Sequence, residues 1–244
     1  MKIGGLEKLS LIDYPGRLAA VVFTIGCTFR CPFCYNPMLV PDNGKSEDTL
    51  PQGKADEGQS SITEAGLFLF LESRRGKLDG VVVSGGEPTM QSDLPEFMSK
   101  VKKIGFEIKL DTNGSNPSML KELIKRRLVD YIAMDIKCDE AGYEKSTGKR
   151  FDFGKIKESV RIIKESGLPY EFRTTCVPGF LDEAAVENMA AMIDGADRWF
   201  LQRFKSDTET IDRSLFGLAG FSEQQMEAFA AIGREHVKEC EIRG

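Results

Sequence analysis

The stretch LAAVVFTIGCTFRCPFC, residues 18–34, decides the fold because it joins a predicted strand to a loop with three cysteines. The apolar and β-branched run 18–25 is typical of a buried strand, and Gly26 ends it. Cys27, Cys31 and Cys34 follow with the spacing Cys-x3-Cys-x2-Cys. Thiolate sulfur is the soft ligand that iron-sulfur clusters and zinc prefer, so these side chains are candidate ligands of one metal centre.

Three cysteines provide one ligand fewer than a metal site with four protein ligands requires. A cubane 4Fe-4S cluster has four irons, so a three-cysteine loop leaves one iron open to a ligand that is not protein. Two other interpretations stay open: a redox dithiol at Cys31 and Cys34, which leaves Cys27 unexplained, and a zinc site, which needs a fourth ligand. The remaining candidate ligands show no paired spacing and are interpreted as non-ligands: Cys138, Cys176, Cys240 and His236.

The composition of the 244-residue chain is that of a globular protein, with 41% hydrophobic and 29% charged residues. A net charge of -5 has the wrong sign for a protein that neutralises phosphates, which argues against nucleic acid as a partner. No apolar run approaches the roughly 20 residues that cross a bilayer, and no secretory signal is visible at the start. We expect a cytoplasmic protein with reduced cysteines and no membrane contact.

Strand-like and helical segments alternate along the chain. Strands are predicted at 18–25, 79–84, 106–110, 131–135, 170–176 and 198–204. Helices are predicted at 62–74, 94–103, 118–127, 153–166, 183–193 and 223–237. Such alternation favours parallel strands with right-handed crossovers, and six units are too few for a closed eight-stranded barrel.

The predicted fold is therefore α/β, a partial (β/α)6 TIM-like barrel in a single domain over residues 1–244. Residues 41–61 have no apolar periodicity and are expected to form an exposed loop, and 205–244 a C-terminal helical extension. In such folds the loops after the strands carry the ligands.

The cysteine loop, with Phe33 just before its third cysteine, resembles the cluster loop of the radical S-adenosylmethionine (SAM) superfamily. The resemblance implies a radical SAM fold and a 4Fe-4S cluster on Cys27, Cys31 and Cys34. It also implies that the amino and carboxylate groups of S-adenosylmethionine chelate the open iron, with Phe33 beside the cofactor.

Gly85, Gly86 and Glu87 follow the second predicted strand. Glycines let a backbone approach a ligand closely, and the carbonyls here, with Glu87, are suited to accept hydrogen bonds from an ammonium group. Gly-Gly after a strand is by itself usually a plain turn. Together with the cysteine loop, however, the segment resembles the superfamily motif that binds the amino group of S-adenosylmethionine.

Two further strands end on acids. A buried carboxylate requires a cation or a donor, or else caps the following helix. The segments resemble those of glycyl-radical-enzyme activases, which implies a small monovalent cation near the cofactor carboxylate, held by Asp111, Thr112, Met134 and Asp135. The same resemblance implies that Asp111 and Lys137 contact the cofactor.

Arg173 interrupts an otherwise apolar or β-branched strand, so it either lies outward or faces an anion. It resembles an activase arginine that contacts the cofactor. Gln202 and Phe204, at the end of the last predicted strand, are the candidates for contact with the adenine.

The segments LSLIDYPG (9–16) and TIGCTFRCPFCYNP (24–37) resemble the activating proteins of anaerobic ribonucleoside-triphosphate reductase. The activases of pyruvate formate-lyase share the Gly-Gly-Glu, Asp-Thr-Asn-Gly and Val-Pro-Gly segments and are the alternative. The resemblance implies that a reduced cluster cleaves S-adenosylmethionine and that the resulting 5'-deoxyadenosyl radical removes a hydrogen from a glycine of a partner enzyme.

In this interpretation no side chain is a catalytic acid or base, since the cofactors carry the chemistry. The partners implied are a glycyl radical enzyme and a one-electron donor such as flavodoxin or ferredoxin. Two more distant alternatives remain: a radical enzyme that acts on a small molecule, as the deazaguanine-forming synthases do, and a zinc-binding adaptor without catalysis.

Overall fold

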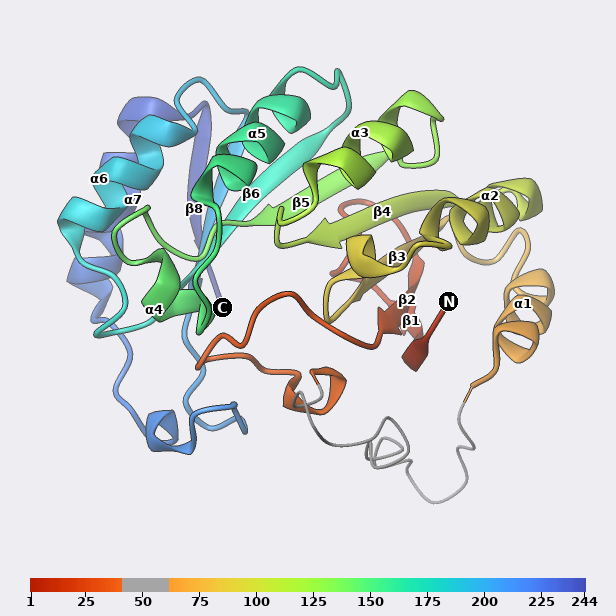
Figure 1. Ribbon diagram of the computed structural model, residues 1–244, viewed down its shortest axis with the longest axis horizontal. Coiled ribbons are helices and arrows are strands. Elements are labelled where there is room, and N and C mark those ends of the chain that lie inside the picture. Colours follow the sequence, from red (N-terminus) through yellow and green to blue (C-terminus); the bar gives the residue numbers. More distant parts are fainter. Residues whose placement is uncertain (41–61) are drawn as a thin grey trace. The chain divides into compact units, whose positions relative to one another are not determined.

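The computed structural model describes residues 1–40 and 62–244, and Figure 1 traces its elements. The predicted exposed loop at 41–61 lies outside the described residues. The chain forms two compact units. Unit 1 comprises the described residues within Met1–Thr28, Met38–Thr112 and Ser118–Ile132, and unit 2 comprises Phe29–Pro37, Asn113–Pro117 and Ala133–Gly244.

Unit 1 contains four strands that follow one another in chain order: β1 (Ile3–Ser10), β2 (Ala19–Thr24), β3 (Gly80–Gly85) and β4 (Glu107–Thr112). β1 pairs with β2 antiparallel, whereas β2, β3 and β4 are parallel. The parallel register places Val82 between Val21 of β2 and Lys109 of β4. The carboxyl ends of β2, β3 and β4 therefore lie at the same edge of the sheet, and the loops with the cysteine and Gly-Gly motifs begin there.

The helices of unit 1 bury apolar side chains. They are α1 (Glu64–Ser73), α2 (Leu94–Ile104) and α3 (Pro117–Lys125), whose first residue belongs to unit 2. In α2 the buried side chains recur at helical spacing, at Leu94, Phe97, Met98, Val101 and Ile104. Gly105 ends α2 at a φ of 106°, a left-handed conformation that glycine adopts without steric cost.

A cluster of buried side chains fills the interior of unit 1. It combines Tyr14, Ala19, Val21, Val82 and Tyr131, and Phe23 packs against it. The Tyr14 and Tyr131 rings meet at a centroid distance of 5.9 Å, and the Tyr14 hydroxyl donates to Glu107 at 3.4 Å. Burial and the negative charge of Glu107 raise the pKa of Tyr14, which keeps this hydroxyl protonated.

Unit 2 contains the parallel strands β6 (Tyr170–Cys176), β7 (Arg198–Arg203) and β8 (Glu239–Arg243). Their register places Thr175 opposite Gln202, and Gln202 opposite Arg243. The helices of this unit are α4 (Tyr143–Thr147), α5 (Phe153–Lys164), α6 (Glu183–Met192) and α7 (Glu223–His236). Helix α6 packs against α7, and α7 packs against β7 and β8. Strand β5 (Tyr131–Asp135) crosses from unit 1 into unit 2.

The α/β fold predicted from the sequence is confirmed, and each of the six predicted strands and six predicted helices appears within two residues of its expected ends. Additional elements are β1, β8, α4 and short 3-10 turns at Pro37–Leu39, Pro88–Met90 and Arg213–Leu215. The C-terminal extension at 205–244, predicted as helical, contains α7 and also the strand β8, which follows α7 and pairs with β7. Among the described residues, no helix combines the length and apolar character of a membrane span.

Candidate active site

The loop from Phe29 to Pro37 belongs to unit 2 and is held there through its backbone. The Arg30 N–H donates to the Thr147 carbonyl at the end of α4, at 2.7 Å. Gly148 follows with a φ of 64°, and a Cβ built on it would lie 2.3 Å from the Arg30 carbonyl oxygen. A side chain at position 148 would therefore displace the cysteine loop, and α4 with its glycine turn fixes the middle of that loop.

Residues on both sides of Cys34 attach the cysteine loop to the segment that follows β7. The Asp212 N–H donates to the Pro32 carbonyl at 2.9 Å, and the Lys205 N–H donates to the Tyr35 hydroxyl at 2.8 Å. The Tyr35 ring stacks on Phe204, with centroids 6.1 Å apart and planes 17° apart. Phe204 is thus 8% exposed and engaged by the cysteine loop, instead of offering a free aromatic face.

Aromatic side chains of the loop point into unit 2. Phe33 is 4% exposed and meets Phe180 edge to face at 5.3 Å. Phe29 is 1% exposed and meets Tyr143 and Phe151 in the same manner, at 5.7 and 5.1 Å. The motif aromatic Phe33 therefore anchors the loop, and its edge-to-face contact accounts for an aromatic residue at this position.

The thiols of Cys31 and Cys34 lie close to a cation in unit 2. Burial raises the pKa of the Cys34 thiol, while the positive charges of Lys137 and Arg30 act in the opposite direction. Burial would lower the pKa of Lys137, but the negative charges of Asp135, Cys31 and Cys34 hold it above its usual value. A permanent ammonium group beside two thiols suits an anionic thiolate centre.

Cys27 belongs to unit 1, so its place in the triad rests on its spacing along the chain. Among the described residues, no three Cys, His, Asp or Glu side chains surround a single point as ligands of one metal ion would. A 4Fe-4S cluster requires a different geometry. Each of its cysteines binds a separate iron, so the cysteine sulfurs do not converge on a single point. The chemistry of the thiol donors and the nearby Lys137 fits such a cluster.

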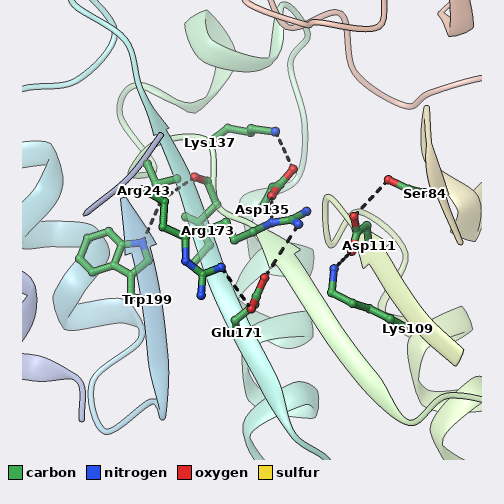
Figure 2. A network of polar contacts seen from close by, with 11 residues as sticks. Ser84, Lys109, Asp111, Asp135, Lys137, Glu171, Arg173, Trp199 and Arg243 are labelled. Carbon is green, nitrogen blue, oxygen red and sulfur yellow. Dashed lines mark hydrogen bonds and ion pairs between the residues drawn. The ribbon is translucent and has the colours of Figure 1, made fainter. Parts of the chain in front are cut away.

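A network of ion pairs connects Asp135, at the end of β5, with Arg173 within β6 in unit 2 (Figure 2). The Asp135 carboxylate accepts a hydrogen bond from Lys137 Nζ at 3.0 Å and another from Arg173 Nε at 2.8 Å. All three side chains are largely buried, with 27% of Asp135 and 16% of each cation exposed. Of the two orientations that its strand context left open, Arg173 faces an anion, and the protein itself supplies that anion.

The network extends to the last strand through a carboxylate that the sequence analysis missed. Arg173 Nη1 lies 3.9 Å from one Glu171 oxygen, and Arg243 Nη1 of β8 lies 3.8 Å from the other (Figure 2). The Glu171 side chain is 3% exposed. Three cations, Lys137, Arg173 and Arg243, therefore contact the carboxylates of Asp135 and Glu171.

The charge states of the network follow from these contacts. Burial alone would raise the pKa of Asp135, but Arg173 and Lys137 hold it well below its usual range. Asp135 is therefore a carboxylate whose two oxygens are engaged by cations of the chain. A monovalent cation there would stand beside an ammonium and a guanidinium group, so the contacts of Asp135 do not fit the predicted cation site.

In unit 1 the two motif glycines pack against the turn that precedes Cys27. A Cβ on Gly85, whose φ is 114°, would lie 2.3 Å from the Thr24 nitrogen, and one on Gly86 would lie 2.0 Å from the Gly26 carbonyl oxygen. The Glu87 N–H also donates to that Gly26 carbonyl, at 2.7 Å. The glycines are thus required by the close packing of two backbones, whatever they contribute to a ligand.

Glu87 is fully buried and its carboxylate lies within unit 1. It accepts hydrogen bonds from the Thr89 N–H at 3.1 Å and from the Thr112 hydroxyl at 2.7 Å, and its closest contact is with the Thr89 hydroxyl. Glu87 therefore caps the 3-10 turn after the Gly-Gly pair and joins it to the end of β4. Thr112, predicted as a cation ligand, is here a donor to this carboxylate.

Asp111 is the second strand-end acid, and it too is paired with a cation of the chain. Its carboxylate forms an ion pair with Lys109 and accepts from the Ser84 hydroxyl at 3.1 Å, as Figure 2 also shows. The Lys109 side chain is 1% exposed, which explains why a lysine can stand inside a strand. These contacts join the ends of β3 and β4 in unit 1.

Two other predicted residues occupy distinct positions in unit 2. Met134 is fully buried, and a Cβ on Gly114 would lie 2.1 Å from its terminal methyl, so its side chain packs against this glycine. Gln202 is partly exposed in β7, between Thr175 and Arg243 of the neighbouring strands.

The remaining cysteines have the properties of inert thiols. Burial raises the pKa of Cys138 to about 11, that of Cys176 to about 12 and that of Cys240 to about 11. His236 lies in the last turn of α7, near its carboxyl end, 2.9 Å from an Asp194 oxygen.

The structure thus groups the predicted residues in two sets. Unit 1 joins the Gly-Gly-Glu segment to the end of β4, and unit 2 joins Asp135, Lys137 and Arg173 near the thiols of Cys31 and Cys34. Sequence reasoning missed the partners Glu171, Arg243 and Thr147. A glutamate two residues before Arg173 on the same face of a strand was the one available signal for such a network.

Comparisons with known proteins agree with this arrangement. The radical SAM superfamily profile matches residues 21–192. A protein of Methanocaldococcus jannaschii, provisionally named as a glycyl-radical enzyme activating enzyme, is 32% identical over 246 residues, covering 99% of this chain and 95% of the relative. A pyruvate formate-lyase-activating enzyme of Clostridium pasteurianum is 30% identical over 190 residues, covering 74% of this chain and 71% of the relative.

Two crystal structures share the fold. A domain of a pyruvate-formate lyase-activating enzyme from Bacteroides vulgatus aligns with a TM-score of 0.54 and 19% identity, over 68% of this chain and 99% of that one. Streptococcus suis SuiB bound to its precursor peptide SuiA aligns with a TM-score of 0.63 and 12% identity, over 92% of this chain and 48% of that one. From the profile match and the sequence relatives, the chain belongs to the radical SAM superfamily and, within it, to the glycyl-radical enzyme activating enzymes.

Proposed function

We propose that this activase installs a glycyl radical on an anaerobic ribonucleoside-triphosphate reductase. The observation that carries the choice of partner is the segment 9–16, LSLIDYPG, followed by the cysteine loop at 24–37, which resembles the activating proteins of that reductase. A second candidate partner is pyruvate formate-lyase, because activating enzymes of that name are among the relatives.

The family implies an iron-sulfur cluster and S-adenosylmethionine, and we assign the cluster to Cys27, Cys31 and Cys34. When bound, the reduced cluster and S-adenosylmethionine supply an organic radical that can remove a hydrogen atom from a glycine. The chain itself holds the cysteine loop in place through Thr147, Gly148 and the bonds around Cys34. Lys137 offsets the negative charge of the thiolates, which stabilises them in the ionised form that ligation requires.

Cofactor contacts are assigned to the residues at the strand ends. Arg173 and Lys137 are assigned to the carboxylate of S-adenosylmethionine, since a guanidinium group pairs well with a carboxylate. The Gly85 and Gly86 backbone is assigned to the amino group, with Glu87 as the residue that fixes this turn. Gln202 is assigned to the adenine, and Phe33 and Asp111 are assigned as further cofactor contacts. The contacts of Asp135 and Asp111 argue against a monovalent cation there.

We also propose that residues 1–244 form a single radical SAM domain and that the protein works in the cytoplasm. The one-electron donor is a flavodoxin or a ferredoxin. No side chain is assigned as a catalytic acid or base.

The proposal is tested with anaerobically reconstituted protein, dithionite and S-adenosylmethionine, mixed separately with the reductase and with pyruvate formate-lyase of the same organism. Electron paramagnetic resonance measures the glycyl radical, and chromatography measures 5'-deoxyadenosine. We expect a radical on the reductase with matching 5'-deoxyadenosine, and neither product with Cys31→Ala. A radical on pyruvate formate-lyase alone would replace the partner, and a radical on neither would overturn the proposed function.

A further inference from the structure

Lys109 is a buried lysine within β4, and its side chain points toward Asp111. One residue separates the two in the chain, so both side chains lie on the same face of the strand. The Lys109 side chain is 1% exposed, and its ammonium group forms an ion pair with one Asp111 oxygen, as Figure 2 shows. The ammonium nitrogen also lies 5.9 Å from the centre of the Tyr131 ring. A charge this deeply buried is stable only with an anion beside it, and Asp111 supplies one.

The second oxygen of Asp111 is engaged as well. It accepts a hydrogen bond from the Ser84 hydroxyl at 3.1 Å, and the Asp111 side chain is 13% exposed. The carboxylate therefore contacts one fixed positive charge and one neutral donor, both from unit 1. A sodium or potassium ion bound to Asp111 would stand directly beside the ammonium group, and like charges repel strongly where water is largely excluded.

The other polar residues predicted as cation ligands are also bonded to groups of the chain. The Thr112 hydroxyl donates to the buried Glu87 at 2.7 Å. In unit 2, Asp135 accepts hydrogen bonds from Lys137 and Arg173. Each of the two carboxylates that the resemblance assigns to a monovalent cation is therefore paired with a cation of the chain. A lysine ammonium carries the same single positive charge as a sodium or potassium ion, on a compact group.

We propose that Lys109 replaces the monovalent cation on Asp111, so that this enzyme cleaves S-adenosylmethionine without sodium or potassium. The inference rests on the proposed function, in which Asp111 contacts the cofactor. Lys109 is then a positioning residue that acts on the cofactor through Asp111, because its charge offsets that of the carboxylate and fixes its direction. A neutral residue at position 109 leaves Asp111 as a buried negative charge that attracts a monovalent cation.

The experiment compares the wild type with three variants and one control. Lys109→Ser removes the charge and leaves space for an ion, whereas Lys109→Met removes the charge and fills most of that space. Lys109→Met/Asp111→Asn removes both charges, so it avoids a buried carboxylate without its cation. Lys238→Ser is the control, because Lys238 pairs with Asp197 at 2.6 Å on the surface and its side chain is 74% exposed.

Each protein is measured in potassium chloride and in tetramethylammonium chloride at the same ionic strength, because the tetramethylammonium ion is too large to replace potassium. The first measurement is urea unfolding of cluster-free protein, which needs no cofactor. The second is partner-free cleavage of S-adenosylmethionine by reconstituted protein, with a photoreduced flavin analogue as a sodium-free reductant. It gives kcat and the KM for S-adenosylmethionine separately.

For the wild type we expect the same urea midpoint and the same KM in both salts. Lys109→Ser should have a lower midpoint and a higher KM in tetramethylammonium chloride, and potassium should restore part of both. Potassium at about ten times the dissociation constant of the new site would shift the folding equilibrium of this variant about tenfold toward the native state. Lys109→Met, the double variant and Lys238→Ser should show no such difference between the salts.

A wild-type protein that loses cleavage when potassium is replaced would overturn this inference alone, because cleavage in potassium chloride would leave the proposed function standing. Equal midpoints of Lys109→Ser in the two salts would also overturn it, as would a potassium effect of the same size in the double variant. A wild-type protein that cleaves no S-adenosylmethionine in either salt would overturn the proposed function and this inference with it.

Discussion

Replacing Asp135 with asparagine would leave two largely buried cations without the anion that they share. Lys137 Nζ and Arg173 Nε lie 3.0 and 2.8 Å from its two oxygens, and each cation is 16% exposed. Removing one partner of a fully buried ion pair costs about 3–5 kcal/mol, and a hydrogen bond to a charged group contributes about 1.5–3 kcal/mol. Because 27% of the Asp135 side chain reaches solvent, we expect the lower end of that range, about 3 kcal/mol.

The assay is urea unfolding of cluster-free protein, in which the loss appears as a lower midpoint at an unchanged slope. The pH dependence has a definite sign. The folded-state pKa of Asp135 is depressed, so its contribution is present above the unfolded pKa of about 3.9 and is lost as pH falls through the folded value. The difference between wild type and Asp135→Asn should therefore be full at pH 7 and shrink on acidification below about pH 4.

Asp197→Asn is the matched control, because Asp197 pairs with Lys238 at 2.6 Å but both side chains are exposed. A surface pair of this kind contributes about 0–1 kcal/mol. The reasoning is refuted if Asp135→Asn destabilises the protein no more than Asp197→Asn does, since the two cations would then not depend on Asp135.

Three further predictions concern Gly86, Thr112 and Cys138. Gly86→Ala should lower the iron bound per chain on reconstitution. Its Cβ would lie 2.0 Å from the Gly26 carbonyl oxygen and would displace the turn that leads to the cysteine loop. An iron content equal to that of the wild type would contradict this prediction. Thr112→Val should lower the unfolding free energy in urea by about 1–3 kcal/mol, since the buried Glu87 loses a donor; an unchanged midpoint would count against it. Cys138→Ala should bind iron as wild type does, and a measured loss would make Cys138 a ligand.

Much of the fold was predictable because it depends on local patterns. The apolar runs at β5 and β6 and the helical period of α2 each determine one element, and the structure places all three where the sequence predicted. Strands β1 and β8 were missed for a physical reason. Gly4 and Gly5 weaken the alternation of β1, and β8 alternates charged with apolar residues over only 5 residues, so pairing with β2 and β7 defines them.

The candidate site was predictable in its residues but not in their partners. The cysteine spacing and the acids at the strand ends point to segments that carry buried ion pairs and close backbone packing in the structure. The sequence could not show that Asp135 binds Arg173, because an ion pair between two strands depends on their register. It also could not show that Gly86 packs against the Gly26 carbonyl, a contact that requires a glycine there whatever its role toward a ligand.

The most direct test of the central claim is electron paramagnetic resonance of anaerobically reconstituted, dithionite-reduced protein, recorded with and without S-adenosylmethionine. If Cys27, Cys31 and Cys34 hold a 4Fe-4S cluster with one open iron, the reduced protein gives a cluster signal that changes when S-adenosylmethionine is added. A colourless protein that contains zinc, or a cluster signal that S-adenosylmethionine leaves unchanged, would contradict the claim.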